Sequence, residues 1–160
     1  MTFSPELEAR FQKFLEGCPP GRERSALIPM LLHAQDEIGS VTSELVDEVS
    51  RRLNLKPVEV DEVVSYYSML RRKPMGKYHF QICTNISCLL RGGQELFQHA
   101  SKRLEIRNKE VTPDGQFSLE EVECLGACSW APAMAVNYDY YHGMTLEGFD
   151  RLMESLEKKQ

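Results

Sequence analysis

The sequence predicts an α+β protein in which a small N-terminal helical bundle precedes a domain built on a mixed sheet. Two observations lead to this fold class. Up to residue 73, apolar residues recur at three- and four-residue spacing, which is the pattern of amphipathic helices. From residue 76 onward, alternating β-rich segments and helical segments follow one another in the order β-α-β-β-β-α. We therefore expect a helical domain over residues 1–73 and an α+β domain over residues 76–160.

Four short helices with short connections are expected in the first domain, which is typical of a small bundle. The Pro- and Gly-rich residues 17–21 break the first helix, and Gly39 ends the second. Pro29 lies within the second helix, which either starts beside this residue or is kinked there. Thr42 is a suitable N-cap for the third helix, and Pro57 suits the first turn of the fourth. The expected apolar faces comprise Phe3, Leu7, Phe11, Phe14 and Leu15; Leu27, Met30, Leu31, Ala34 and Ile38; Leu45, Val46, Val49 and Leu53; and Val60, Val63, Val64, Tyr67 and Leu70.

The second domain is expected to contain short strands and two helices. Its first helix is predicted to begin just past Cys88, and its second closes the chain through residues such as Phe149 and Met153. Thr112, Pro113, Asp114 and Gly115 form a turn sequence. The elements expected in the order β-α-β-β-β-α are strands at 78–82, 104–106, 117–122 and 133–138, and helices at 89–103 and 146–156; a further strand is expected to start at 140–142, after a turn.

Composition excludes several classes of function. The formal net charge is −5 and is spread evenly along the chain, so we expect no nucleic-acid partner. No run of about 18 uncharged apolar residues is present, so no direct membrane insertion is expected. The first residues lack the pattern of a secretory signal, so we expect the chain to stay in a reducing compartment. There, five cysteines indicate metal or redox chemistry rather than a disulfide framework.

Four of the five cysteines form two pairs in the second domain. Cys83 and Cys88 enclose four residues, and Cys124 and Cys128 enclose three. Each pair follows a predicted strand, so both are expected to face one pocket. Four thiolates complete either an iron–sulfur site or a structural zinc site, and the spacing alone leaves both open. Cys18 lies far from the others in a Pro/Gly turn and is interpreted as incidental.

Two other interpretations of the cysteines find little support in the sequence. Buried structural cysteines would not be expected in two loop-based pairs at strand ends. A thiol–disulfide enzyme would be expected to carry a C-x-x-C motif, which neither pair has. The four histidines are scattered, form no visible nucleophile–base pair, and lie outside both cysteine loops, so no catalytic residue is predicted.

The motifs Cys83-Thr84-Asn85-Ile86-Ser87-Cys88 and Cys124-Leu125-Gly126-Ala127-Cys128-Ser129-Trp130-Ala131-Pro132 resemble the family of the 24-kDa [2Fe–2S] subunit of respiratory complex I, the NADH:quinone oxidoreductase. The resemblance extends from about residue 5 to 155. It implies a thioredoxin-like ferredoxin domain, with a [2Fe–2S] cluster held by Cys83, Cys88, Cys124 and Cys128. It therefore favours iron over zinc.

The resemblance also implies a function and a partner. The chain is expected to exchange single electrons with FMN on a flavoprotein of about 51 kDa that holds the NADH site, within a larger respiratory complex. Gly92-Gly93 is no dinucleotide fingerprint, so the chain alone should not oxidise NADH. The expected location is cytoplasmic, and the complex is expected to hold the chain on the cytoplasmic side of the inner membrane. Related subunits of NAD-dependent hydrogenases and formate dehydrogenases, and a zinc-stabilised interaction domain without redox function, are the alternatives.

The sequence supports three further expectations. The helical domain is expected to be a docking module, with an exposed surface around Tyr66, Tyr67, Met69 and Leu70. Trp130, Pro132 and Met134 are expected either to form an apolar wall at the cysteine site or to pack in the core. The Ala131-Pro132 bond precedes a strand at the place where thioredoxin-like folds often have a cis proline, so a cis bond is hypothesised there.

Overall fold

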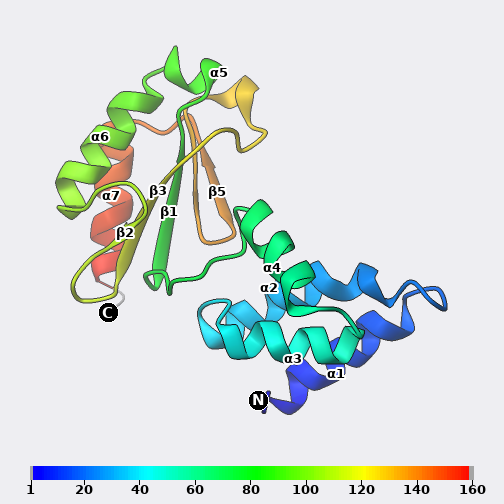
Figure 1. The fold of residues 1–160 in the computed structure, drawn as a ribbon. Helices are drawn as coiled ribbons and strands as arrows, with labels where there is room; N and C mark the ends of the chain where they lie inside the picture. Colours follow the sequence, from blue (N-terminus) through cyan, green and yellow to red (C-terminus); the bar gives the residue numbers. More distant parts are fainter. Residues whose placement is uncertain (1, 159–160) are drawn as a thin grey trace. The chain divides into compact units, whose positions relative to one another are not determined.

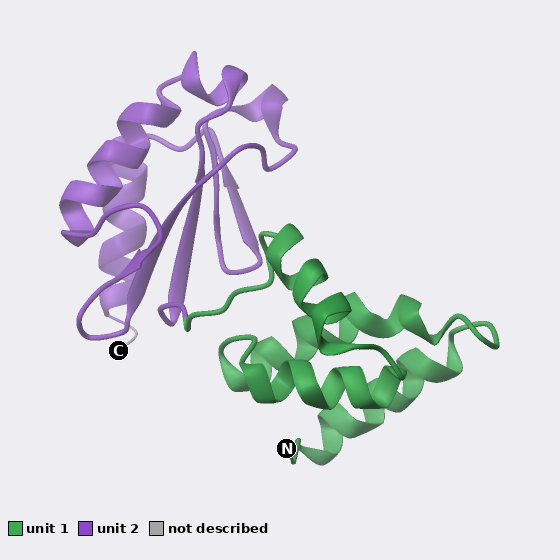
Figure 2. Ribbon diagram, in the orientation of Figure 1, with its two compact units in different colours: residues 1–74 green, residues 75–160 purple. Residues whose placement is uncertain are grey.

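The computed structural model describes residues 2–158 and contains two compact units, with the boundary between Pro74 and Met75 (Figure 2). Unit 1 is helical, and unit 2 contains the sheet (Figure 1). The mixed α+β class predicted from the sequence is confirmed. No helix within residues 2–158 is both long enough and apolar enough to cross a lipid bilayer.

Unit 1 consists of short helices whose ends follow from local sequence. The Ser4 hydroxyl accepts a hydrogen bond from the Leu7 N–H at 3.2 Å, and the Thr42 hydroxyl accepts one from Leu45 at 3.3 Å, so each caps the following helix. Gly39 ends its helix at a φ of 94°, in the left-handed region that glycine tolerates. The elements are α1 (Pro5–Glu16), η1 (Glu23–Ala26), α2 (Leu27–Ile38), α3 (Ser43–Leu53) and α4 (Pro57–Tyr66).

The apolar faces predicted for the helices form a single core in unit 1. Met30, Leu31, Leu45, Val49 and Val60 are each fully buried in it. Helix α2 begins at Leu27, so Pro29 lies in its first turn, where the missing N–H costs no helical hydrogen bond. Of the two possibilities that the sequence left open, the helix therefore starts beside Pro29 and is not kinked there.

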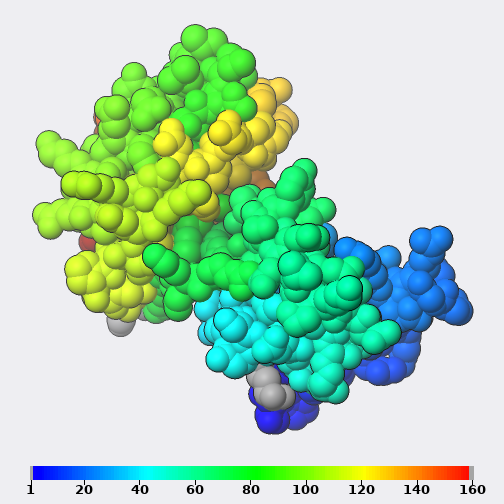
Figure 3. Space-filling view, in the orientation of Figure 1, coloured from blue at the N-terminus to red at the C-terminus, as the bar shows by residue number. Residues whose placement is uncertain are grey.

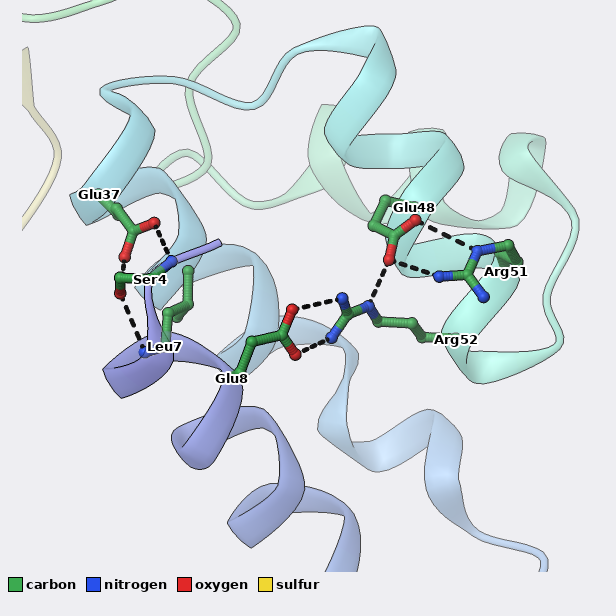
Figure 4. A network of polar contacts seen from close by, with 7 residues as sticks. All are labelled: Ser4, Leu7, Glu8, Glu37, Glu48, Arg51 and Arg52. Atoms are coloured by element: carbon green, nitrogen blue, oxygen red, sulfur yellow. Dashed lines mark hydrogen bonds and ion pairs between the residues drawn. The ribbon is translucent and has the colours of Figure 1, made fainter. Parts of the chain in front are cut away.

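Polar contacts also connect the helices of unit 1 (Figure 4). Arg52 on α3 donates to Glu8 on α1 through Nη1 at 2.6 Å and Nη2 at 2.7 Å, and to Glu48 on its own helix through Nε at 2.6 Å. The same guanidinium lies over the rings of Phe3 and Phe11, at 5.1 and 5.3 Å from their centroids. Arg52 therefore joins α1 to α3 through charge and ring contacts together.

Unit 2 contains a five-stranded mixed sheet in the order β2-β3-β1-β4-β5. The central strands β1 and β3 are parallel, with Tyr78 paired to Phe117 and Cys83 to Val122, and the other neighbours are antiparallel. Because β1 and β3 run the same way, the loops that follow them start at the same edge of the sheet. The strands are β1 (Tyr78–Cys83), β2 (Glu110–Val111), β3 (Phe117–Val122), β4 (Ala133–Val136) and β5 (Asp139–His142).

Two helices, α6 (Gly93–Leu104) and α7 (Leu146–Glu157), lie side by side along the sheet (Figure 1). The side chains of Phe80, Ile82 and Leu119 belong to the core of unit 2, which α7 completes with Phe149 and Met153. All five of these side chains are fully buried. The core therefore fixes β1 and β3, the strands that lead into the cysteine loops.

The structure corrects the expected helix at 89–103. Residues Ile86–Leu89 form a separate short helix, α5, which contains Cys88, and α6 starts only at Gly93. Gly92 separates the two with a φ of 91°. The long helix therefore does not begin directly after Cys88, and Arg91 lies in the connection between the two helices.

The short strand expected at 104–106 is also wrong. Leu104 is the last residue of α6, and Glu105 ends that helix at a φ of 57°. The edge strand β2 lies later, at Glu110–Val111, where no alternation of polar and apolar residues indicates it. The turn at 112–115, the strand over Phe117–Val122 and the closing helix are where they were expected.

Candidate functional site

The two cysteine loops leave the sheet at one edge, one after β1 and one after β3. The strand pairing continues beyond the strands, because the Thr84 N–H donates to the Val122 carbonyl at 3.2 Å. The Thr84 hydroxyl donates to Glu121 Oε1 at 2.8 Å. These contacts hold the start of the first loop against the end of β3.

The side chains of all four predicted cysteines line one cavity of about 130 Å³. Cys83 ends β1, Cys88 lies in α5, and Cys124 and Cys128 flank the loop that leads into a single 3₁₀ turn, η2 (Cys128–Trp130). Asn85, Ile86 and Ser87 complete the lining. On the surface, the green segment after β1 and the yellow to orange segment after β3 lie next to each other at this end of unit 2 (Figure 3).

The inner pair of cysteines, Cys83 and Cys88, is buried, with each residue 2% exposed. Gly93, the first residue of α6, packs directly against the backbone of both. A Cβ at residue 93 would lie 2.7 Å from the Cys83 carbonyl oxygen and 2.9 Å from that of Cys88. Only glycine allows this approach, so Gly93 fixes the inner pair between β1, α5 and α6. This role was not expected from the sequence, where its one available signal is the Gly92-Gly93 pair, which follows the C-x₄-C motif after three residues.

The outer pair, Cys124 and Cys128, is exposed to solvent. Their sulfurs are 3.8 Å apart, and the Gly126 N–H donates to Cys124 Sγ at 3.3 Å. Gly126 has a φ of 75°, a conformation that suits glycine and directs its amide toward the sulfur. A backbone donor of this kind stabilises negative charge on a thiolate.

Two of the four thiols, those of Cys88 and Cys128, have a raised pKa and so hold their protons more tightly than isolated cysteines do. Burial raises the pKa of Cys88 to about 11, although the Ala133 N–H acts in the opposite direction. The hydrogen bond and charge of Cys124 raise the pKa of Cys128. Gathering four thiolates here is therefore unfavourable until a cation displaces the protons, which is the behaviour of a metal site.

The geometry of the outer cysteine pair fits one metal ion. Two thiolates about 2.3 Å from a tetrahedral metal lie about 3.8 Å apart. The sulfurs of Cys124 and Cys128 have this spacing. Among residues 2–158, no three His, Cys, Asp or Glu side chains are placed to hold one ion together. Two cysteine pairs around one cavity suit a cluster of two irons, with one pair for each iron.

A second, larger hollow of about 620 Å³ adjoins the outer pair, and Arg91, Cys128, Trp130 and His142 are among its lining residues. Trp130 is 65% exposed, with its ring centroid 5.8 Å from that of His142. The expected apolar wall therefore does not include all three residues: Met134 belongs to the core, whereas Trp130 faces solvent. The Ala131-Pro132 bond is cis, as hypothesised.

The other residues singled out in the sequence do not line the cavity. Cys18 is in unit 1, where its thiol donates to the Phe14 carbonyl at 3.3 Å. His79 is a buried histidine of the sheet, with Nδ1 2.9 Å from the Ser118 hydroxyl. In the expected docking surface of unit 1, Tyr66 is 81% exposed and Met69 is 44% exposed, but Leu70 is buried at 5% and is not part of that surface.

Comparison with known proteins adds an independent observation. A family model described as thioredoxin-like [2Fe–2S] ferredoxin matches residues 11–157. The chain is 40% identical over 155 residues to a subunit of the NADH-quinone oxidoreductase of Rhizobium meliloti (strain 1021), covering 97% of this chain and 89% of the relative. It is 42% identical over 135 residues to NADH-quinone oxidoreductase subunit 2 of Thermus thermophilus, covering 84% and 72%.

Among solved structures, an NAD⁺-reducing [NiFe]-hydrogenase in the air-oxidised state matches with a TM-score of 0.73. The sequence identity is 20%, and the match covers 84% of this chain and 23% of the hydrogenase chain. At this identity, the likeness establishes a shared fold and carries no further information about function.

Proposed function

The chain belongs to the thioredoxin-like [2Fe–2S] ferredoxin family, and on this premise we propose that it is the electron-transfer subunit of an NADH-quinone oxidoreductase. The relatives named for that complex align with most of this chain and with most of their own length. The chain is accordingly part of an oxidoreductase complex rather than an enzyme that acts alone.

Cys83, Cys88, Cys124 and Cys128 are the proposed ligands of the cluster. The observation that carries this assignment is that all four line one cavity, although the two pairs are 36 residues or more apart in sequence. When bound, a [2Fe–2S] cluster supplies one-electron oxidation and reduction. The chain's own residues hold it: the inner pair is fixed by strand and helix, and the outer pair lies at the surface.

The partner proposed for this site is a flavoprotein that carries FMN and the NADH site. NADH releases two electrons as a hydride, so a flavin is needed to divide them into single electrons. In this chain, Gly93 packs against the cysteine backbones and Gly92 provides the left-handed turn between α5 and α6, so neither glycine marks a dinucleotide site. Electron transfer from NADH therefore requires a second protein.

Four exposed apolar side chains form the proposed contact with the flavoprotein, and three of them, Ile86, Leu90 and Trp130, line the cysteine cavity or the adjoining hollow. Ile86 is 71% exposed, Leu89 50%, Leu90 79% and Trp130 65%. We call these four residues the cluster-side patch. Apolar residues exposed together are typical of interaction surfaces. A partner on this patch would bring its flavin near the outer cysteine pair and shield that pair from water.

The patch is tested with Leu90→Glu in the full chain. We expect weaker binding to the purified flavoprotein, with the cluster's visible and EPR spectra unchanged. Tyr138→Glu is the matched control, because Tyr138 is 77% exposed in the same unit but does not line the cysteine cavity or the adjoining hollow. Equal affinities for Leu90→Glu and wild type would remove the patch from the interface.

The docking role of unit 1 is a separate proposal, now restricted to Tyr66, Tyr67 and Met69. Tyr66 and Tyr67 meet edge to face, with ring centroids 5.2 Å apart. Tyr66→Glu is expected to weaken flavoprotein binding, measured by the same titration. An unchanged affinity would mean that the exposed tyrosine has no part in docking.

The host complex is proposed to be respiratory. The relatives at about 40% identity carry the name of NADH-quinone oxidoreductase, whereas the hydrogenase likeness establishes the fold alone. We further propose a position on the cytoplasmic side of the inner membrane, reached through partner proteins of the complex. Co-purification with the products of neighbouring genes distinguishes a respiratory complex from a hydrogenase or a formate dehydrogenase.

The function is tested by purifying the chain anaerobically and measuring its metal content. We expect about two irons and two acid-labile sulfides per chain, and an S = ½ EPR signal after reduction. Cys88→Ser should lose the iron, and Cys18→Ser should keep it, because Cys18 lies in unit 1. With the flavoprotein added, NADH should reduce the cluster. Colourless protein with one zinc per chain would contradict the proposal.

A further inference from the structure

The two cysteine pairs of the site differ in how far their backbones can move. Cys83 is held in the sheet by its pairing with β3, and Cys88 lies in α5. Gly93 packs so tightly on both that even a methyl group would overlap their carbonyl oxygens. The inner pair is therefore closed in on the backbone side and covered from solvent.

The outer pair has the opposite surroundings. Cys124 and Cys128 are exposed, and they flank a loop outside any strand. A Cβ built on Gly126, in the middle of that loop, would meet no atom within 4 Å. The loop therefore has open space on this side, and its two sulfurs are already 3.8 Å apart. A disulfide requires about 2.05 Å, so a movement of about 2 Å in an exposed loop suffices.

From this asymmetry we propose that the outer pair is a redox-modification site: in the cluster-free chain, Cys124 and Cys128 form a disulfide that blocks cluster loading until it is reduced. Four cysteines could form a single disulfide in six different pairings. The structure favours the pair that is exposed, lies on a loop outside the sheet and has its sulfurs 3.8 Å apart. The consequence for loading rests on the proposed function, but the disulfide itself does not.

The reaction is an ordinary thiol–disulfide exchange with an oxidised low-molecular-weight disulfide, for which glutathione disulfide is the probe. One outer cysteine, as its thiolate, attacks a sulfur of glutathione disulfide, forming a mixed disulfide and releasing one glutathione. The second outer cysteine then attacks the protein sulfur of that mixed disulfide and releases the other glutathione. The two cysteines lose two electrons and two protons together, and glutathione disulfide gains them.

The disulfide would act on loading by removing two of the four ligands. A sulfur bound in a disulfide is no longer a thiolate, and metal binding requires thiolates. Cluster assembly would then depend on the thiol redox state of the compartment through this pair alone. The inner pair would stay reduced and keep its position for the next loading.

The test uses the full chain with Cys18→Ser, so that only the four site cysteines remain. The cluster is removed by chelation, retention of the fold is checked by far-UV circular dichroism, and the chain is incubated with glutathione disulfide. Free thiols are then alkylated in denaturant, and the peptides are mapped by mass spectrometry. We expect a Cys124–Cys128 disulfide as the main product, with Cys83 and Cys88 alkylated.

Matched variants separate this pairing from the others. Cys83→Ser should still form the outer disulfide, and Cys124→Ser should form no internal disulfide under the same conditions. The oxidised chain should lose its uptake of iron and sulfide, and dithiothreitol should restore it. A main product linking Cys83 to Cys88, or an inner to an outer cysteine, would overturn the inference, as would chains that carry only mixed glutathione disulfides.

The two proposals fail in distinguishable ways. If the outer disulfide forms but the reduced chain never takes up iron, the proposed function fails and the modification site stands. If the reduced chain loads normally but oxidation joins other cysteines or leaves loading unchanged, this inference fails alone.

Discussion

A residue without a side chain determines how closely the elements of the cysteine site approach. Gly93 lies where the backbones of Cys83 and Cys88 meet the first residue of α6. Its φ is not in the left-handed region, so the requirement for glycine here is space and not backbone conformation. Gly126 differs, because its φ of 75° is itself the requirement.

Replacing Gly93 by alanine is expected to disturb the site through this contact. A Cβ 2.7 Å from the Cys83 carbonyl must push backbone and not a flexible side chain. We expect Gly93→Ala to lower the free energy of unfolding by about 1–3 kcal/mol and to reduce the iron retained per chain. Urea unfolding and iron analysis measure the two effects.

Gly17→Ala is the matched control, because a Cβ there would be 3.5 Å from its nearest neighbour, an ordinary contact. It should retain full iron content. Full iron content in Gly93→Ala as well would mean that the cysteine backbones tolerate a displacement that the structure argues against.

The role of a single residue could be predicted from the sequence where it depends on the residue type and its spacing along the chain. The four cysteines could be recognised because thiolate ligands must come in sets at suitable spacing, and the structure places all of them around one cavity. Gly93 could not be recognised, because its function is a contact between three elements. The exposure of Trp130 was likewise inaccessible, since whether an aromatic residue packs or faces solvent depends on its three-dimensional surroundings.

For helices and strands, the elements of unit 1 followed from apolar spacing and capping residues. Thr42 caps α3 and Gly39 ends α2, as expected from their local chemistry. The expectations for unit 2 failed where an element is too short to show a period. Helix α5 has four residues and β2 has two, so neither contains enough positions to reveal a helical or strand pattern.

The contact between α1 and α3 is expected to depend on Arg52. This side chain makes three charge-assisted hydrogen bonds to Glu8 and Glu48 and covers two phenylalanine rings. Arg52→Gln should lower the free energy of unfolding by about 1.5–3 kcal/mol, measured by urea titration of the far-UV circular dichroism signal.

Arg51→Gln serves as the control for charge alone. Arg51 also donates to Glu48, at 2.6 Å from Nη2, but its side chain is 70% exposed. Arg51→Gln should therefore lower the free energy of unfolding by at most about 1 kcal/mol. Equal losses in the two variants would contradict the assignment of Arg52 as the link between the helices.

The ion pairs of Glu48 with Arg51 and Arg52 predict that the stability of the chain depends on pH. The Arg51 and Arg52 guanidiniums lower the pKa of Glu48 from 4.5 to about 2 in the folded chain. A carboxyl with a depressed folded pKa contributes stability above its unfolded pKa and loses that contribution as the pH falls through the folded value. The stability that Glu48 contributes should therefore be complete above about pH 5 and decline between about pH 4.5 and 2.

Glu48→Gln removes this contribution and provides the comparison. The difference in unfolding free energy between wild type and Glu48→Gln should be largest near neutral pH and shrink as the pH falls toward 2. Urea titrations at several pH values measure it. A difference that stays constant or grows on acidification would show that the charge of Glu48 is not what stabilises the helices.

In the molecule as a whole, each unit has its own core and the cysteine site belongs to one of them. The core of unit 1 uses residues from Phe3 to Leu70, and the cores of unit 2 start at Phe80. All four site cysteines lie in unit 2. The assignment of docking to unit 1 and of cluster binding to unit 2 remains a prediction.

This assignment predicts that residues 75–160 alone bind the cluster. The separate fragment should contain about two irons per chain and give the same EPR signal as the full chain. Residues 1–74, which contain Cys18 and none of the four site cysteines, should bind no iron. A fragment 75–160 that folds by circular dichroism but binds no iron would show that unit 1 is needed to form the site.

The proposed cluster can be located by its irons. The four sulfurs are proposed to hold two irons in the cavity of about 130 Å³ between the cysteine loops. Anomalous diffraction at the iron edge, on crystals of the anaerobically purified chain, should show two neighbouring peaks there. One peak should lie within bonding distance of the sulfurs of Cys83 and Cys88, and the other within bonding distance of those of Cys124 and Cys128. A single peak at the zinc edge, or irons outside this cavity, would contradict the proposed cluster.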